Sequence, residues 1–176
     1  MSGMEIHGRA CMLAAYGAAA LGVGMTPIDA RAESGMCPVA QRALFSCGVG
    51  AKEVSVCASG NLTETTGTIQ YRFGQPSRVE LAYPPAGSDW RAVTRGGTVA
   101  FSGGGGAFLA FEKRPYRYVV YTAVGQGWGT KSGVVVERSG KRVANLSCAT
   151  VATSELGPAL FSQAGIKPFE EDFELP

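Results

Sequence analysis

Apolar and polar residues alternate along most of the chain beyond residue 40, with the period of two that is typical of half-buried β-strands. In residues 68–74, for example, Ile69, Tyr71 and Phe73 fall on one face, and polar residues lie between them. The longest run, residues 116–124, is rich in aromatic and β-branched side chains, which favour strands. Turns rich in glycine and proline separate the segments. We therefore predict an all-β domain, an antiparallel barrel or sandwich of about eight strands.

A run of four glycines interrupts this pattern between the apolar segments 98–101 and 107–111. Such a run is disfavoured inside a strand, because glycine loses the most backbone freedom on ordering, but it suits a tip between two strands. A second glycine-rich tip, residues 125–133, contains a tryptophan that has no core there to bury it. We interpret the two tips as a candidate binding surface, and the alternative is that both are plain flexible turns. The residues of this candidate binding surface are Ser102, Gly103, Gly104, Gly105, Gly106, Phe108 and Trp128.

The two ends of the chain differ from the alternating middle. An uncharged, Ala- and Gly-rich stretch, residues 10–25, precedes the small-x-small sequence Ala30-Arg31-Ala32. This order is typical of a signal peptide, so we expect cleavage after Ala32 and a periplasmic or secreted protein that leaves the membrane after cleavage. Residues 33–153 then form the β-domain. Residues 154–176 predict a C-terminal extension with at most a short helical turn and an acidic end, and we expect this extension to be partly disordered.

Four cysteines follow the predicted cleavage site: Cys37, Cys47, Cys57 and Cys148. An even number in an exported chain indicates two disulfides, and three pairings are possible. If the hairpin between residues 43 and 57 turns at Gly50, Cys47 lies across from Glu53, and Cys47 and Cys57 do not meet. One of them should therefore pair with Cys148. Our first choice is Cys57 with Cys148 and Cys37 with Cys47.

Composition excludes several classes of function. The formal net charge of the 176-residue chain is only +2, and no basic run is present, which disfavours nucleic acid as a partner. The one histidine, His7, lies in the predicted signal peptide, so the mature chain lacks Ser-His and Cys-His nucleophile pairs and His-based zinc sites. The cysteine spacings also lack the close pairs of a thiolate zinc site. We therefore expect no enzyme, no metal site and no cofactor.

Several segments carry a resemblance to known proteins. They are residues 44–47, 54–57, 71–74 and 80–84, followed by the Ser-Gly tip and a late cysteine. In this order the chain resembles small exported β-proteins of proteobacteria and, more distantly, the periplasmic lysozyme inhibitors. The resemblance implies a β fold that presents a loop with a Ser-Gly-x-Tyr type motif to an enzyme's cleft. Ser102 and Gly103 match the start of that motif, and Phe108 is the first aromatic residue after it.

Two functional hypotheses follow. The first is an exported protein-interaction module similar to a lysozyme inhibitor, whose partner is a lysozyme or another cell-wall enzyme. The alternative is a β-barrel that binds a small apolar ligand without catalysis, because barrels of about eight strands hold one small ligand.

Overall fold

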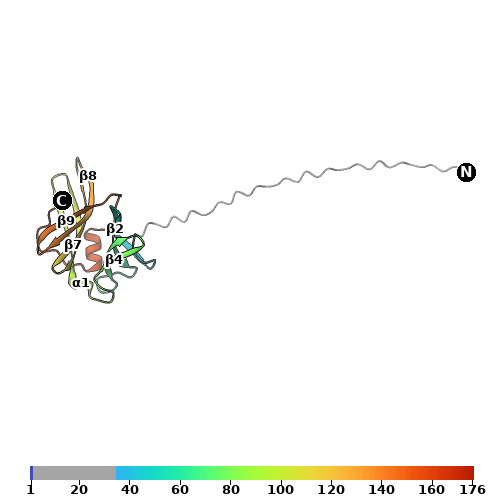
Figure 1. Ribbon diagram of the computed structural model, residues 1–176, viewed down its shortest axis with the longest axis horizontal. Helices are drawn as coiled ribbons and strands as arrows, with labels where there is room; N and C mark the ends of the chain where they lie inside the picture. Colours follow the sequence, from blue (N-terminus) through green and yellow to red (C-terminus); the bar gives the residue numbers. More distant parts are fainter. Residues whose placement is uncertain (2–34) are drawn as a thin grey trace. The chain divides into compact units, whose positions relative to one another are not determined.

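A computed structural model describes Met1 and residues 35–176 of the chain (Figure 1). The predicted signal peptide and its cleavage site lie outside the described residues. The described part folds into two antiparallel sheets, so the predicted all-β class is confirmed, and of the two predicted architectures the sandwich is the one observed.

Sheet A is the five-stranded sheet with the order β10-β1-β2-β3-β4. Its four main strands form successive hairpins, as the alternation predicts, and the short strand β10 returns from late in the chain to pair with β1. The bounds are β1 Gln41–Val49, β2 Lys52–Ser59, β3 Ile69–Gln75, β4 Arg78–Tyr83 and β10 Thr153–Ser154.

Sheet B is a five-stranded meander in which every strand pairs with the next one along the chain, in the order β5-β6-β7-β8-β9. Strands β5 and β9 are therefore its edges. The bounds are β5 Thr94–Phe101, β6 Gly104–Lys113, β7 Tyr116–Gly125, β8 Gly129–Arg138 and β9 Lys141–Ser147. The helices are the single turn α1, Trp90–Val93, and α2, Pro158–Ala164, which lies between the strands of the two sheets in the view of Figure 1.

The main hydrophobic core fills the space between the sheets. Alternate residues of both sheets face it, and α1 and α2 add one or two side chains each. No barrel closes around a cavity in residues 35–176, and side chains occupy the space where a barrel would hold a ligand. Large side chains of this core include Leu44, Phe45, Ile69, Tyr71, Trp90, Leu109, Phe111 and Leu160.

The disulfides are Cys37–Cys57 and Cys47–Cys148, so our first choice of pairing is wrong. A bulge in β1 between Ala43 and Phe45 places Cys47 across from Val54 instead of Glu53. A slip of one residue moves a side chain to the opposite face of its sheet. Cys47 therefore points into the core, where it meets Cys148. Cys57 points to the outer face of sheet A, where it forms a disulfide with Cys37.

The C-terminal extension packs against the β-domain. Beyond β10 and α2, the last nine residues, 168–176, pack on the outer face of sheet B; we call them the C-terminal segment. Phe169, Phe173 and Leu175 cover a second cluster of buried side chains on that face. The cluster consists of Phe108, Ala110, Val119, Tyr121 and Val135. The acidic side chains between the apolar ones remain exposed, as the composition predicts.

Candidate recognition surface

The ends of two neighbouring hairpins lie side by side at one end of sheet B. Ser102 and Gly103 connect β5 to β6, and residues 126–128 connect β7 to β8. Gly103 has a φ of +79°, which favours glycine in this turn. The backbone N–H of Gln126 donates to the carbonyl oxygen of Gly103 at 2.8 Å. This bond ties the two turns together, so the two predicted tips form one continuous surface.

Trp128 is the largest exposed aromatic residue on this surface. It lies over Gly125, where an added Cβ would come within 2.1 Å of the indole ring, so a larger residue would displace the tryptophan. Its ring centroid is 5.7 Å from that of Phe101 and 5.1 Å from the Lys131 ammonium nitrogen. Trp128 is 40% exposed and Phe101 is 36% exposed. We call Phe101, Ser102, Gly103, Trp128 and Lys131 the tip surface.

The glycine run contributes less to the tip than expected. Only Ser102 and Gly103 form the turn, whereas Gly104, Gly105 and Gly106 lie inside β6 and pair with β5 and β7. The reason is close packing of strands: a Cβ on Gly104 would lie 2.2 Å from the carbonyl oxygen of Val124. These three glycines therefore allow strands to approach one another, and they do not form an open loop.

Phe108 does not belong to the tip surface. It is 3% exposed, and its ring lies 5.3 Å from that of Phe169 and 4.5 Å from that of Phe173, measured between centroids. The C-terminal segment buries it. Phe101 takes its place as the second aromatic side chain of the surface. Its signal in the sequence was the alternation of Val99 and Phe101 at the end of an apolar segment.

Arg117 on β7 holds the C-terminal segment against sheet B. Its two terminal nitrogens donate to the two carboxylate oxygens of Glu171, each at 2.8 Å. It also bonds Glu112 on β6 and Glu137 on β8, and it lies over the ring of Phe169. The hydrogen bond from Arg117 lowers the pKa of Glu171, and the same bond is the main cause that raises the pKa of Arg117.

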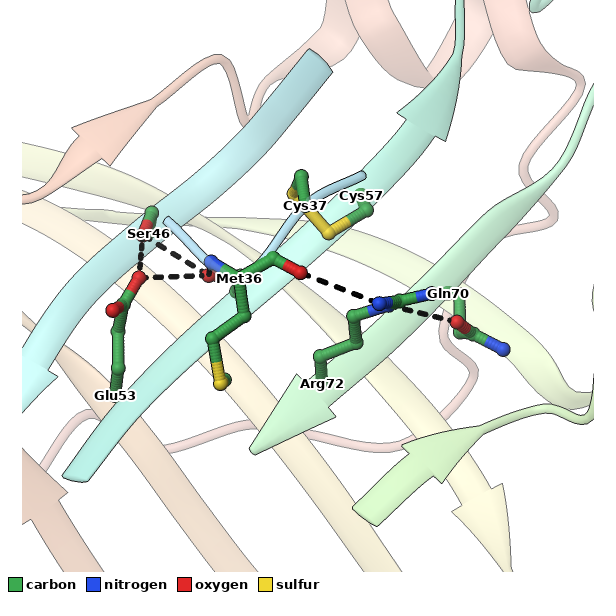
Figure 2. Close-up of a disulfide and its surroundings, with 8 residues drawn as sticks. Met36, Cys37, Ser46, Glu53, Cys57, Gln70 and Arg72 are labelled. Carbon is green, nitrogen blue, oxygen red and sulfur yellow. Dashed lines mark hydrogen bonds between the residues drawn. A yellow bond between two sulfur atoms is a disulfide. The ribbon is translucent and has the colours of Figure 1, made fainter. Parts of the chain in front are cut away.

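A polar cluster under the N-terminal segment has a structural role. Figure 2 shows Met36 on the outer face of sheet A, next to the Cys37–Cys57 disulfide. The Met36 N–H donates to Ser55 Oγ at 3.1 Å. The hydroxyls of Ser46 and Ser55 both donate to Glu53, at 3.0 and 3.2 Å. Because these groups satisfy one another, the cluster anchors the N-terminal segment on sheet A.

Other features limit the chemistry of residues 35–176. No group of three or more His, Cys, Asp or Glu side chains in this part of the chain is placed to hold a metal ion. No helix there is long and apolar enough to cross a membrane. The two disulfides indicate an extracytoplasmic protein, because reducing compartments keep cysteines as thiols.

Comparison with protein-family models, with curated proteins and with solved structures found no match.

Proposed function

We propose that the chain is a periplasmic or secreted protein-interaction module that contacts a protein partner with its tip surface. The proposal is of binding without catalysis. The observation that carries it is the pairing of Trp128 and Phe101 across two adjacent turns, both partly exposed. Aromatic anchors of this kind dominate the energetics of protein interfaces, because they bury a large area with few rotatable bonds.

Further groups on the tip surface suit recognition. Ser102 offers an exposed hydroxyl that donates or accepts a hydrogen bond, and Lys131 places a positive charge beside the aromatic pair. The two turns are held by a backbone hydrogen bond and by strands on both sides, so little order has to be gained on binding. By its resemblance to the periplasmic lysozyme inhibitors, we propose a lysozyme or another cell-wall enzyme as the partner.

The experiment is a pull-down of cell-wall enzymes, with chicken-type and invertebrate-type lysozymes included, followed by calorimetric titration of any partner found. Trp128→Ala should weaken binding at least about tenfold, because it removes an anchor of about 2 kcal/mol. Ser102→Ala should weaken binding less. The melting temperature of both variants should stay close to that of the unchanged protein, because both side chains lie at the surface.

Val143→Ala is the matched control. Val143 is an exposed apolar residue on β9, which begins at the end of sheet B opposite to the tips. Its truncation should leave binding unchanged. Equal binding by Trp128→Ala and Val143→Ala would contradict the proposal, and so would a destabilisation of Trp128→Ala by the roughly 3–5 kcal/mol of a core deletion.

A further inference from the structure

The edge of sheet B at β5 is only partly covered. The N–H of Gly96 donates to the carbonyl oxygen of Lys167 at 3.0 Å, and its carbonyl oxygen accepts from the N–H of Phe169 at 2.9 Å. These bonds point away from β6. Alternate residues of an antiparallel strand direct their N–H and C=O groups to the same side, so those of Thr98 and Ala100 also point away from β6. Within residues 35–176, no strand pairs with them there.

A groove of about 960 Å³ follows this open edge. On the side of the core, it is lined by Phe161 and Ile166, at and just beyond α2. On the outer side, it is lined by Phe173 and Leu175 of the C-terminal segment. The edge of β5 lies between these two apolar walls. A strand added here would alternate its side chains between the two walls.

The outer wall is acidic. Glu170, Asp172 and Glu174 are exposed along it, and their carboxylates form no ion pair within residues 35–176. The nearby Arg142 bonds the backbone carbonyl of Glu174 and not its carboxylate. No lysine or arginine is among the described residues that line the groove. The groove therefore favours a positively charged occupant.

We propose that this groove binds an extended, basic peptide segment of a partner protein by strand addition to β5. Its backbone pairs with Thr98 and Ala100, its apolar side chains face Phe161, and the lysines or arginines between them face the acidic wall. Long basic side chains suit this wall, because their stems lie on apolar surface while their charged ends reach the carboxylates. A second copy of this chain is disfavoured as the occupant, since pairing two β5 edges would bring two acidic walls together.

This site goes beyond the proposed function, because it binds a different occupant along the β5 edge and needs no partner of the tips. It adjoins the tip surface at Phe101, which lines the groove, whereas Trp128 does not. It is tested with a synthetic hexapeptide that alternates lysine and valine, with blocked ends, by calorimetric titration of the full domain at low salt. The peptide should bind, and binding should weaken as salt is added. A peptide that alternates glutamate and valine should not bind. The lysine peptide N-methylated at every backbone nitrogen should also fail, because neither of its edges has the donors that a β ladder requires.

Ala100 provides a matched pair of variants. Ala100→Pro removes an N–H that points away from β6, so the ladder with β6 stays intact, and proline is tolerated at strand edges. It should weaken binding of the lysine peptide about tenfold, as the loss of a ladder hydrogen bond and local clash require. Ala100→Ser keeps the N–H and should bind normally. The circular dichroism spectrum of each variant shows whether the fold is retained.

Three results would overturn the proposal: no binding of the lysine peptide, equal binding by Ala100→Pro and Ala100→Ser, or a dimer through β5 in sedimentation without peptide. A test of the tips remains separate, because Trp128→Ala should leave peptide binding unchanged. If the lysine peptide does not bind, while a protein partner still binds the tip surface through Trp128, only the inference about the groove is wrong.

Discussion

Arg117 lies among three carboxylates on the outer face of sheet B, two from neighbouring strands and one from the C-terminal segment. Glu112 and Glu137 are its direct cross-strand neighbours, and opposite charges at such positions stabilise a sheet. One carboxylate is enough to neutralise the guanidinium of Arg117. With three carboxylates around it, the four charged groups together carry a net negative charge, so Arg117 stays ionised and is held in place. Glu171 is the member that connects this group to the C-terminal segment.

The contact between Arg117 and Glu171 predicts a pH dependence of the C-terminal segment. Because folding lowers the pKa of Glu171, the ionised carboxylate stabilises the docked segment at pH values above the ordinary glutamate pKa of about 4.3. This stabilisation is lost progressively as the pH falls below that value toward the lowered pKa. The NMR shifts of the Phe169 and Phe173 rings should report release of the segment in this acidic range.

Glu171→Gln should partly release the segment already at pH 7 and reduce the acid-induced change. Glu170→Gln is the control, because the neighbouring Glu170 forms no ion pair within residues 35–176. If the Phe169 and Phe173 ring shifts of both variants change with pH in the same way, the contact between Glu171 and Arg117 does not control the docking of the C-terminal segment.

At the scale of elements, the C-terminal segment acts as a cover for sheet B. It pairs with the edge of β5 at Gly96 and then crosses the outer face toward β8 and β9. Its far end is held by bonds from Lys131 and Arg142 to its backbone carbonyls. Without it, Phe108 and Tyr121 would face water. The same segment forms one wall of the groove along β5, so it shapes that site as well.

Phe173→Ala tests this cover. Phe173 is partly buried against Phe108 and Tyr121, so its truncation should lower the free energy of unfolding by about 1–2 kcal/mol, less than a core deletion. Urea unfolding measures the change, and binding of a hydrophobic dye should rise. Val151→Ala, at a side chain that is 97% exposed, should change stability by less than about 0.5 kcal/mol. Equal stability of the two variants would show that the segment is not docked.

The elements themselves were largely predictable, because alternation and turn residues are local signals. The segments expected as strands in residues 43–148 are strands in the structure, except residues 90–94, where helix α1 forms. The turns of sheet B lie beside the glycine-rich stretches, although Gly104, Gly105 and Gly106 belong to β6. The disulfide pairing and the packing of the C-terminal segment were not predicted, because they depend on contacts between residues far apart in the sequence. The bulge at Ala43–Phe45 shifts a register that only the packed core specifies, and so reverses the face of Cys47. The docking of Phe169 and Phe173 depends on Arg117, more than fifty residues away, as the separation of 54 between Arg117 and Glu171 shows.

At the scale of the whole domain, each sheet has its outer face covered in part by one end of the folded chain. Residues 35–37 lie on sheet A, where the Cys37–Cys57 disulfide fixes them, and the C-terminal segment lies on sheet B. The Cys47–Cys148 disulfide runs through the core and joins β1 of sheet A to the residue after β9 of sheet B.

The two disulfides should contribute unequally to stability. Cys47–Cys148 spans 101 residues and Cys37–Cys57 spans 20, so the chain-entropy model assigns them about 4.7 and about 3.3 kcal/mol. The paired variant Cys47→Ala with Cys148→Ala should therefore be about 1.4 kcal/mol less stable than Cys37→Ala with Cys57→Ala, as measured by urea unfolding. Peptide mapping without reduction checks the pairing itself. Recovery of a Cys37–Cys47 peptide would contradict the register on which this prediction depends.

The Cys47–Cys148 bond also determines how the domain transmits mechanical force. A pull on the two ends of the folded chain would pass from residue 47 directly to residue 148 through the sulfur atoms. Strands β2 to β9 lie inside that covalent ring, and those beyond Cys57, β3 to β9, would carry no tension along their backbones. Only the ends outside the ring could be drawn out, at no more than about 3.6 Å per residue. The tips and most of sheet B would thus stay folded while the terminal segments peel away.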